Sequence, residues 1–422
     1  RTMIARLGGD FNVGWRGWWR GRRGHREHAN AGFLRLQMSL VPTSATPLSA
    51  LCETSQKKWP FCNKKLLTRA ATRATAASGT LAAPPEPIEK SIVHGLAWLA
   101  AQQLPDGSWV SGDSCNDIAS TALAVLKFES RAFELGLDPL DPTYEYALQV
   151  AGGLAFIMTF RLEQPIGLQP AGDPDSNGNG IGVYFDRCGY HQIYNTAAAM
   201  MALAASQHPE LYAATLQDAV DFMAWAQTDE GCGPSRGGWR YFSNACDSDN
   251  SNSGYVTLGL GYAAALPPCG FGLAIPDWVK AELSPWLDVM QDDVNGDPDD
   301  GGSWYDPSWA WVNILKTGNL LYEFALVGDP VGAPRVQDAI DYIERHWSDP
   351  GSGGTGWLDH RQAMFAMMKG LEAYGIDLLD LDGDGTPETD WFDAMSTHLL
   401  ATQNADGSWP WDPWADPILS TT

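Results

Sequence analysis

Acidic and amide side chains recur at alternate positions in glycine-rich stretches of this 422-residue chain, a spacing that suits a hard metal ion. The clearest stretch is DLDGDGTPETD, which offers Asp380, Asp382 and Asp384, followed by Glu388. Gly385 permits the sharp turn that brings such carboxylates together on one cation. We therefore expect calcium at this loop, and the alternative is a solvated acidic turn.

Two other loops repeat this spacing less completely. The stretch DPDSNGNGIG offers Asp173, Asp175, Asn177 and Asn179. A looser copy, DDVNGDPDDGG, places its polar groups at Asp293, Asn295, Asp297 and Asp299. The loop at 380–390 resembles the start of an EF-hand loop, although Trp391 stands where that loop ends in glutamate. Weak sites of this kind suit the millimolar calcium found outside cells.

Two alternating sets of predicted helices must position these loops. Larger apolar residues at helical spacing recur over 88–103, 144–160, 211–227, 276–291, 333–347 and 389–403. Helices of smaller residues lie between them at 117–129, 194–206, 252–266, 313–327 and 361–375, and a sixth begins at 418. One residue of each smaller helix marks a repeat with steps that average about 60 residues: Thr121, Thr196, Ser253, Thr317, Ala363 and Thr421.

This repeat predicts an all-α (α/α)6 toroid over residues 84–422, with six outer and inner helix pairs. Small side chains let the inner helices pack closely around an axis, while the larger amphipathic helices face outward. The last inner helix is missing, since the chain stops at Thr422. We expect a gap there with apolar neighbours exposed, and other domains beyond the C-terminus.

The turns that enter the inner helices share one pattern. QLPDGSW begins at Gln103, QNADGSW begins at Gln403, and GGWRYFSNACDSDNSNSGYVTLGL and DGGSWYDPSWAW are related. These turns resemble the QW motifs of the terpenoid cyclase and protein prenyltransferase superfamily, including proteins with prenyltransferase and squalene-oxidase repeats. We expect the glutamine to bond carbonyls at an outer helix end, and Asp-Gly to make the turn. Trp109 and Trp409 are then expected to be buried staples.

The resemblance implies isoprenoid chemistry of two kinds, of which the first needs a protonated acid. Squalene-type cyclases place an Asp-x-Asp-Asp motif over the central cavity, and the match in this sequence, Asp297-Pro298-Asp299-Asp300, falls in the third acidic loop. The candidate acids just before inner helices are Asp117 and Asp249, each four residues before a Ser/Thr marker. Their matching positions favour helix N-capping over catalysis.

Protein prenyltransferases instead hold a catalytic zinc through Asp, Cys and His. Asp186, Cys188 and His191 offer such a set just before the second inner helix. The family's Tyr-His pair belongs to a later helix, whereas here it follows Cys188 directly after one glycine. The alternative is a disulfide cysteine beside a helix cap.

Charge divides the chain into two parts. Residues 1–83 carry 14 basic and 3 acidic side chains. We interpret them as a disordered leader or a mis-called N-terminus, and the alternative is a basic arm that binds an anionic partner. Residues 84–422 carry 13 basic and 48 acidic side chains, so this domain repels nucleic acid and anionic membranes. No stretch is long enough for a membrane span, and no clear signal peptide is visible.

Loop cysteines in an acidic chain indicate an oxidising compartment, and Cys232 and Cys246 flank a loop that they could close. We therefore expect a secreted or cell-surface bacterial protein. The favoured function is a non-catalytic toroid of an exported protein, which binds an apolar or polymeric ligand and is stabilised by calcium loops. The alternatives are an isoprenoid enzyme of the cyclase or prenyltransferase type and a carbohydrate-active (α/α)6 enzyme.

Overall fold

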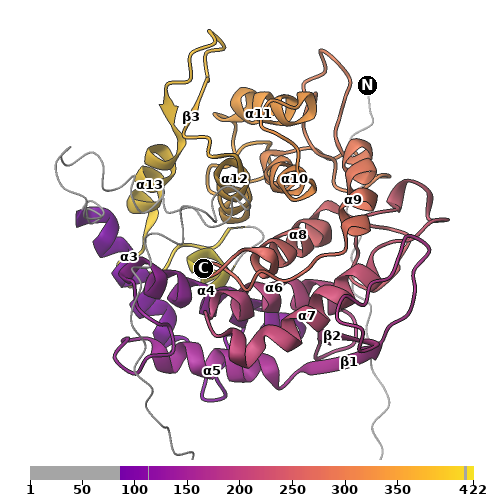
Figure 1. Ribbon diagram of the computed structural model, residues 1–422. Helices are drawn as coiled ribbons and strands as arrows, with labels where there is room; N and C mark the ends of the chain where they lie inside the picture. The colour runs from indigo at the N-terminus through magenta and orange to yellow at the C-terminus, as the bar shows by residue number, and fades with distance from the viewer. Residues whose placement is uncertain (1–85, 113, 413–415) are drawn as a thin grey trace, which may run out of the picture. The chain divides into compact units, whose positions relative to one another are not determined.

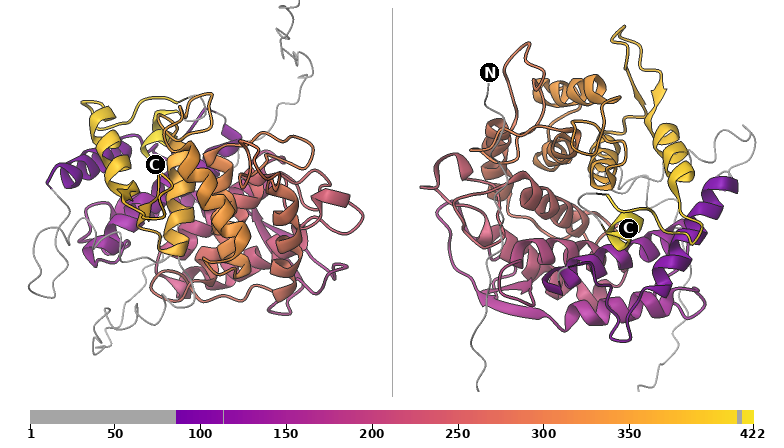
Figure 2. Two further views of the ribbon diagram at one scale, coloured as in Figure 1. Left: turned by 90° about the horizontal axis from the view of Figure 1, so that it is seen from above. Right: turned by 180° about the vertical axis from the view of Figure 1, so that it is seen from behind.

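The computed structural model describes residues 86–112, 114–412 and 416–422, so the predictions for residues 1–83 lie outside the described residues. The described residues are mostly helical (Figures 1 and 2). None of their helices is long and apolar enough to cross a membrane.

An inner set of helices follows the predicted segments of small residues. It comprises α4 (Asp117–Leu135), α6 (Gln192–Ala205), α8 (Asn250–Ala264), α10 (Ile314–Val327), α12 (Arg361–Tyr374) and α14 (Pro417–Thr421). Neighbours in this order pack together from α4 to α12, and α14 packs against α4. Their backbones approach closely, since a Cβ on Gly318 would lie 2.5 Å from the backbone nitrogen of Met367. Small residues are therefore required on these faces.

An outer set of helices surrounds the inner set. It comprises α3 (Glu86–Ala101), α5 (Ala147–Met158), α7 (Pro209–Ala226), α9 (Asp277–Met290), α11 (Pro334–His346) and α13 (Trp391–Thr402). The first and last outer helices, α3 and α13, contact each other. The predicted all-α toroid is confirmed. In the described residues the sixth inner position holds only the five-residue α14.

Two short antiparallel hairpins interrupt the helices, and the sequence analysis did not predict them. β1 (Arg161–Pro165) pairs with β2 (Ile181–Phe185), and β3 (Leu378–Leu379) pairs with β4 (Thr389–Asp390). The hairpins close the bases of two of the three candidate calcium loops, with Pro165 opposite Ile181 in the first and Leu379 opposite Thr389 in the second.

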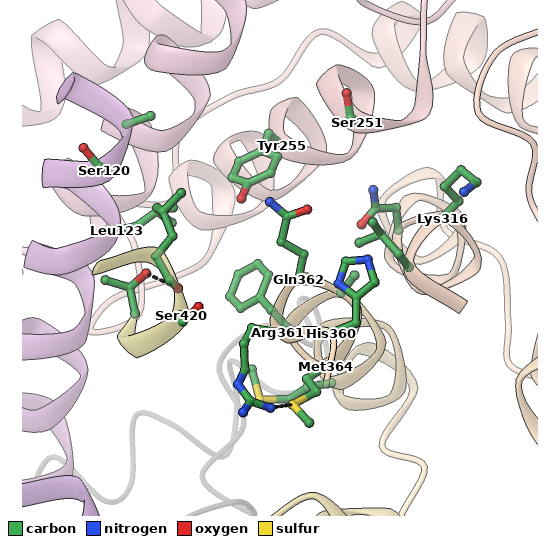
Figure 3. A pocket seen from close by; sticks show the side chains of 18 of the residues that line it. Ser120, Leu123, Ser251, Tyr255, Lys316, His360, Arg361, Gln362, Met364 and Ser420 are labelled. Atoms are coloured by element: carbon green, nitrogen blue, oxygen red, sulfur yellow. Dashed lines mark hydrogen bonds between the residues drawn. The ribbon is translucent and has the colours of Figure 1, made fainter. Parts of the chain in front are cut away.

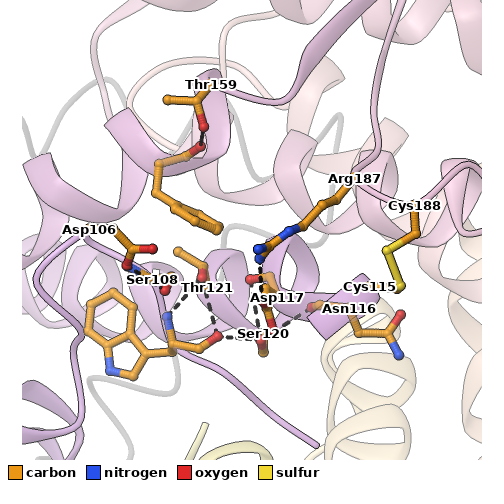
Figure 4. Close-up of polar contacts among 12 residues, drawn as sticks. Asp106, Ser108, Cys115, Asn116, Asp117, Ser120, Thr121, Thr159, Arg187 and Cys188 are labelled. Atoms are coloured by element: carbon orange, nitrogen blue, oxygen red, sulfur yellow. Dashed lines mark hydrogen bonds and ion pairs between the residues drawn. A yellow bond between two sulfur atoms is a disulfide. The ribbon is translucent and has the colours of Figure 1, made fainter. Parts of the chain in front are cut away.

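The marker hydroxyls of the repeat connect each turn to the inner helix that follows it. The backbone N–H of Trp109 donates to Thr121 Oγ1 (2.9 Å), and Ser120 Oγ donates to the carbonyl of Trp109 (2.6 Å; Figure 4). The same bond joins Phe185 to Thr196, Trp239 to Ser253, Ser303 to Thr317 and Trp409 to Thr421. Ala363 has no hydroxyl, so the fifth repeat cannot make this bond.

The glutamine of each turn joins two outer helices. Gln103 Nε2 donates to the carbonyl of Gly107 (3.0 Å) and to that of Gln149 in α5 (2.9 Å). Equivalent pairs of bonds run from Gln227 to Gly237 and Val279, from Gln291 to Gly301 and Arg335, and from Gln403 to Gly407 and Ser91. The expected bonds to carbonyls at the end of the preceding outer helix are therefore replaced by bonds to the turn and to the next outer helix.

Indole N–H groups complete these turns, from the buried Trp109 and Trp239 and the half-buried Trp409. Trp109 Nε1 donates to the carbonyl of Leu99 (2.7 Å), and Trp409 Nε1 donates to that of Leu399 (2.9 Å). Trp239 bonds Met223 in the same way. The expected structural role of these tryptophans is confirmed, because each bond joins a turn to the last residues of its outer helix.

Two disulfides lie among the described residues. Cys232–Cys246 closes the loop before α8, as expected from their spacing. Cys115–Cys188 joins the short 3-10 helix η1 (Ser114–Asn116) to the loop before α6. A second 3-10 helix, η2 (Gly233–Ser235), lies inside the loop closed by the first of these disulfides.

Candidate functional site

A central cavity of about 760 Å³ lies among the inner helices. Residues of α4, α6, α8, α10, α12 and α14 line it, and so does one face of the outer helix α13. Because α14 is a single turn, Phe392 and Met395 of α13 reach the cavity past the sixth inner position. The cavity is large enough for a small organic ligand.

The wall of this cavity is mostly aromatic and aliphatic. Its aromatic members are Tyr194, Tyr241, Tyr255, Tyr305, Trp311, Tyr322, Phe365, Trp391, Phe392 and Trp409. Its aliphatic and thioether members are Ala119, Leu123, Leu315, Met364, Ala366, Met368, Met395, Leu399 and Leu419. We call this set the apolar wall. Such a surface binds apolar molecules, because water leaves it at little cost.

Three basic side chains at the starts of α10 and α12 belong to the cavity lining, and we call Lys316, His360 and Arg361 the basic end. Figure 3 shows His360 and Arg361 at the start of α12 and Lys316 at the start of α10. All three are buried.

Lys316 is unusual because its ammonium has no hydrogen-bond acceptor. Its Nζ lies 3.6 Å from the ring centroid of Trp311, and no described residue accepts a hydrogen bond from it. Burial lowers the pKa of Lys316 to about 7, against the opposing charge of Asp299. The amine therefore changes charge near neutral pH.

His360 and Arg361 also lack carboxylate partners for their side chains. Burial lowers the pKa of His360, and the charge of Lys316 lowers it further, although Asp412 acts in the opposite direction. The guanidinium of Arg361 donates to Thr402 Oγ1 (3.1 Å) and to the sulfur of Met364 (3.5 Å). A guanidinium stays protonated in proteins, so the cavity contains a permanent positive charge.

No aspartate or glutamate side chain lines the cavity among residues 86–112, 114–412 and 416–422. This distribution is opposite to that of the domain as a whole, where acids outnumber bases by 48 to 13. The cavity is therefore an apolar and basic interior within an acidic protein.

The two candidate acids, Asp117 and Asp249, lie outside the cavity lining. Asp249 is the N-cap of α8, where it accepts from the backbone of Asn252 (2.7 Å), and it pairs with Arg240. Asp117 is instead the first residue inside α4 and pairs with Arg187 (2.6 Å; Figure 4). Capping is thus confirmed for Asp249 and not for Asp117.

The candidate zinc residues do not converge on a common point. Cys188 is bonded to Cys115 and so has no thiolate for a metal. Asp186 accepts the backbone N–H of Cys188 (3.1 Å), and His191 lines the central cavity, where it packs against Tyr241. Cys188 is therefore a disulfide cysteine, which was the alternative to a zinc ligand.

The loop at 380–390 brings its acids together. Oxygens of Asp380, Asp382 and Asp384 all lie within 4.8 Å of one another. Asp380 accepts the backbone N–H of Gly383 (2.9 Å) and that of Gly385 (2.7 Å), which folds the loop around its carboxylate. Glu388 accepts a bond from Thr389. Oxygen ligands at this spacing fit calcium.

The loop at 173–180 has the same backbone register, with Asp175 in the place of Asp380. Asp175 accepts the backbone N–H of Gly178 (2.9 Å) and that of Gly180 (2.7 Å). Asp173 therefore precedes the repeated pattern, which continues through Asn177 and Asn179. Both amides donate to Asp218 of α7, a carboxylate that the sequence analysis missed because it lies 39 residues or more away along the chain.

The third acidic loop has a different pattern of hydrogen bonds between its aspartates and its backbone N–H groups. Asp300 accepts the backbone N–H of Gly296 (3.3 Å), and Asp297 accepts that of Asp299 (2.8 Å). Asp293 and Asn295 belong to no acidic group that could hold a metal among the described residues.

The basic end of the cavity was also missed by sequence analysis. Lys316 and Arg361 stand at the start of predicted inner helices, where a basic residue is ordinarily exposed. The isolated lysine in NILKTGNLLYEFALV, among apolar and small residues, was the available signal.

No protein-family model matches this chain, and no curated protein matches it. Among solved structures, the chain is similar to the type II terpene cyclase MstE from Scytonema in its apo form. The identity is 15% and the TM-score 0.44, over 77% of this chain and 82% of that chain. Values this low assign no residue of the site.

Proposed function

We propose that this protein binds one elongated, mainly apolar molecule in its central cavity, with the oxygen-bearing end of that molecule at the basic end. The observation that supports this proposal is that one cavity of about 760 Å³ is lined by both the apolar wall and the basic residues Lys316, His360 and Arg361. Apolar contact supplies affinity, and the few polar groups fix the orientation of the ligand.

The lining supports binding over acid-initiated cyclisation or glycoside hydrolysis. Cyclisation of an isoprenoid needs a proton donor in the cavity, and glycoside hydrolysis needs two carboxyl groups across the bound sugar. Neither Asp nor Glu lines the cavity in the part of the chain that the structure describes. An isoprenoid ligand is compatible with this proposal as a bound molecule.

Calorimetric titration of the full chain with dodecanoate and with dodecanol tests the proposal. We expect one site for either probe, and Leu123→Trp should weaken binding at least about tenfold, or 1.4 kcal/mol, by filling the cavity. Arg361→Met should weaken dodecanoate more than dodecanol. Leu148→Trp is the matched control, because Leu148 is 84% exposed on α5.

Equal affinity of the Leu123→Trp variant and the unchanged protein would place the ligand elsewhere and overturn the proposal. Absence of binding for both probes would do the same. Thermal melts of each variant check that the fold is retained.

We further propose that calcium at the loops beginning at Asp380 and Asp175 stabilises the domain. Clustered carboxylates in the first loop and the shared register of the second support this proposal. The two disulfides and weak calcium sites both suit an exported or cell-surface protein.

A further inference from the structure

Lys316 is buried at the wall of the central cavity, where the indole of Trp311 covers its amine. Only 3% of the residue is exposed, and it is one of the residues that line the cavity. A lysine that serves only as a charge is normally paired or reaches solvent, because an isolated buried ammonium is costly. In the part of the chain that the structure describes, Lys316 Nζ has no hydrogen-bond acceptor and contacts the face of Trp311.

We propose that Lys316 is a nucleophile that captures an apolar aldehyde in the central cavity as an imine. This inference rests on the proposed function, because the apolar wall must first bind the carbon chain of the aldehyde. The basic end then holds the carbonyl group near the amine.

The groups around Lys316 favour the neutral amine that this reaction requires. Burial is the cause that lowers the pKa of Lys316 and so favours the neutral form. Asp299 is the carboxylate whose charge opposes this effect. At pH 7.5, a lysine with a pKa of about 7 is neutral roughly several hundred times more often than an ordinary surface lysine.

The reaction is a condensation without oxidation or reduction. The nitrogen lone pair of Lys316 attacks the carbonyl carbon, and a proton moves from nitrogen to oxygen to give a carbinolamine. The hydroxyl then leaves as water as the C=N bond forms. His360 has an Nδ1 without a hydrogen-bond partner and lines the same cavity, so it can move protons during this exchange.

The test is reductive trapping of the full chain with dodecanal and sodium cyanoborohydride at pH 7.5, followed by mass spectrometry. We expect one dodecyl adduct per chain, mapped to Lys316, formed at least about a hundredfold faster than adducts on exposed lysines such as Lys90. Dodecanoate should slow this labelling by competing for the cavity.

Lys316→Arg should abolish the fast adduct while it keeps the positive charge beside Trp311. Lys280→Arg is the control, because burial also lowers the pKa of Lys280 but this residue of α9 is not part of the cavity lining. That variant should retain the adduct at Lys316. Site mapping on the unchanged protein remains decisive even if the Lys316 variant does not fold.

A fast adduct at Lys127 or at surface lysines alone would overturn the inference. If dodecanoate and dodecanol bind but dodecanal leaves no fast adduct at Lys316, the imine inference fails and the proposed binding function stands. If neither probe binds, the binding function fails on its own test.

Discussion

Individual carboxyl groups buried without partners set the pH dependence of this protein. Both oxygens of Glu323 on α10 and both of Glu129 on α4 lack hydrogen-bond partners among the described residues. Burial raises the pKa of each well above its ordinary value, and the charge of Asp249 adds to the effect at Glu323. These side chains therefore stay protonated in the folded state at pH values where the unfolded chain releases the proton.

We predict that Glu323→Gln increases the free energy of unfolding at pH 8 by about 1–3 kcal/mol and changes it little at pH 4. The folded state of the unchanged protein binds the extra proton, so its stability is full below about pH 4.5 and falls as pH rises toward the folded-state pKa. Glutamine has the same shape as protonated glutamate but does not titrate, so the variant loses no stability through deprotonation at this position. Urea unfolding at several pH values measures the difference.

Glu145→Gln is the control for this prediction, because Glu145 is exposed on the loop before α5. It should leave the pH dependence unchanged. An unaltered slope for Glu323→Gln between pH 5 and 8 would contradict the assignment of that slope to Glu323.

At the scale of elements, the two hairpin loops offer oxygen ligands on rigid bases. Each loop is held by a pair of short strands and by backbone N–H groups that bond one aspartate. The backbone N–H of Asp380 also donates to the carboxylate of Glu344 in α11 (2.7 Å), and this hydrogen bond connects the second hairpin to an outer helix. Calcium at these loops would therefore stabilise hairpin and helix together.

We predict that 10 mM calcium raises the free energy of unfolding by about 1.4–2.7 kcal/mol per occupied site with a Kd of about 0.1–1 mM. Asp382→Asn should reduce this gain, because it removes a charge from the acid cluster. Asp293→Asn is the matched control from the third loop. A thermal melt that does not respond to calcium or chelator would contradict the calcium proposal.

At the scale of the whole domain, the first and last outer helices are joined by the same turn contacts that repeat elsewhere. Gln403 Nε2 donates to the carbonyl of Ser91 in α3 (2.9 Å), 312 residues earlier in the chain. Gly407 lies so close to α3 that a Cβ would come within 2.3 Å of the carbonyl of His94. The outer helices thus close through α3 and α13.

We predict that Gln403→Leu selectively weakens amide hydrogen-exchange protection in α3, because the Ser91 carbonyl loses its side-chain donor. The cost should be about 1–3 kcal/mol of local stability. Gln227→Leu is the control: it removes the equivalent bond to Val279, and protection should fall in α9 while α3 is unaffected.

Uniform loss of protection over all helices in both variants would show that these bonds support the whole domain equally. That outcome would contradict the local role assigned to each glutamine.

The sequence by itself determined the helices, the order of the repeats and the turns that join them. These features depend on local spacing: small residues mark inner helices, and Gln, Asp-Gly and Trp recur in each complete turn. The cap at Asp249 and the Cys232–Cys246 pair were accessible for the same reason. The acids at 380–384 are close in sequence and so close in space.

Only the tertiary structure decided what the interior of the ring contains. Lys316 and His360 lie 44 residues apart in sequence, and Trp311 lies against the lysine, so their meeting depends on how α10 and α12 pack. The sequence shows the excess of acids, but not that the acidic side chains of the described residues stay out of the cavity. Burial then changes the chemistry of Lys316, because desolvation is a property of the packed cavity and not of the residue.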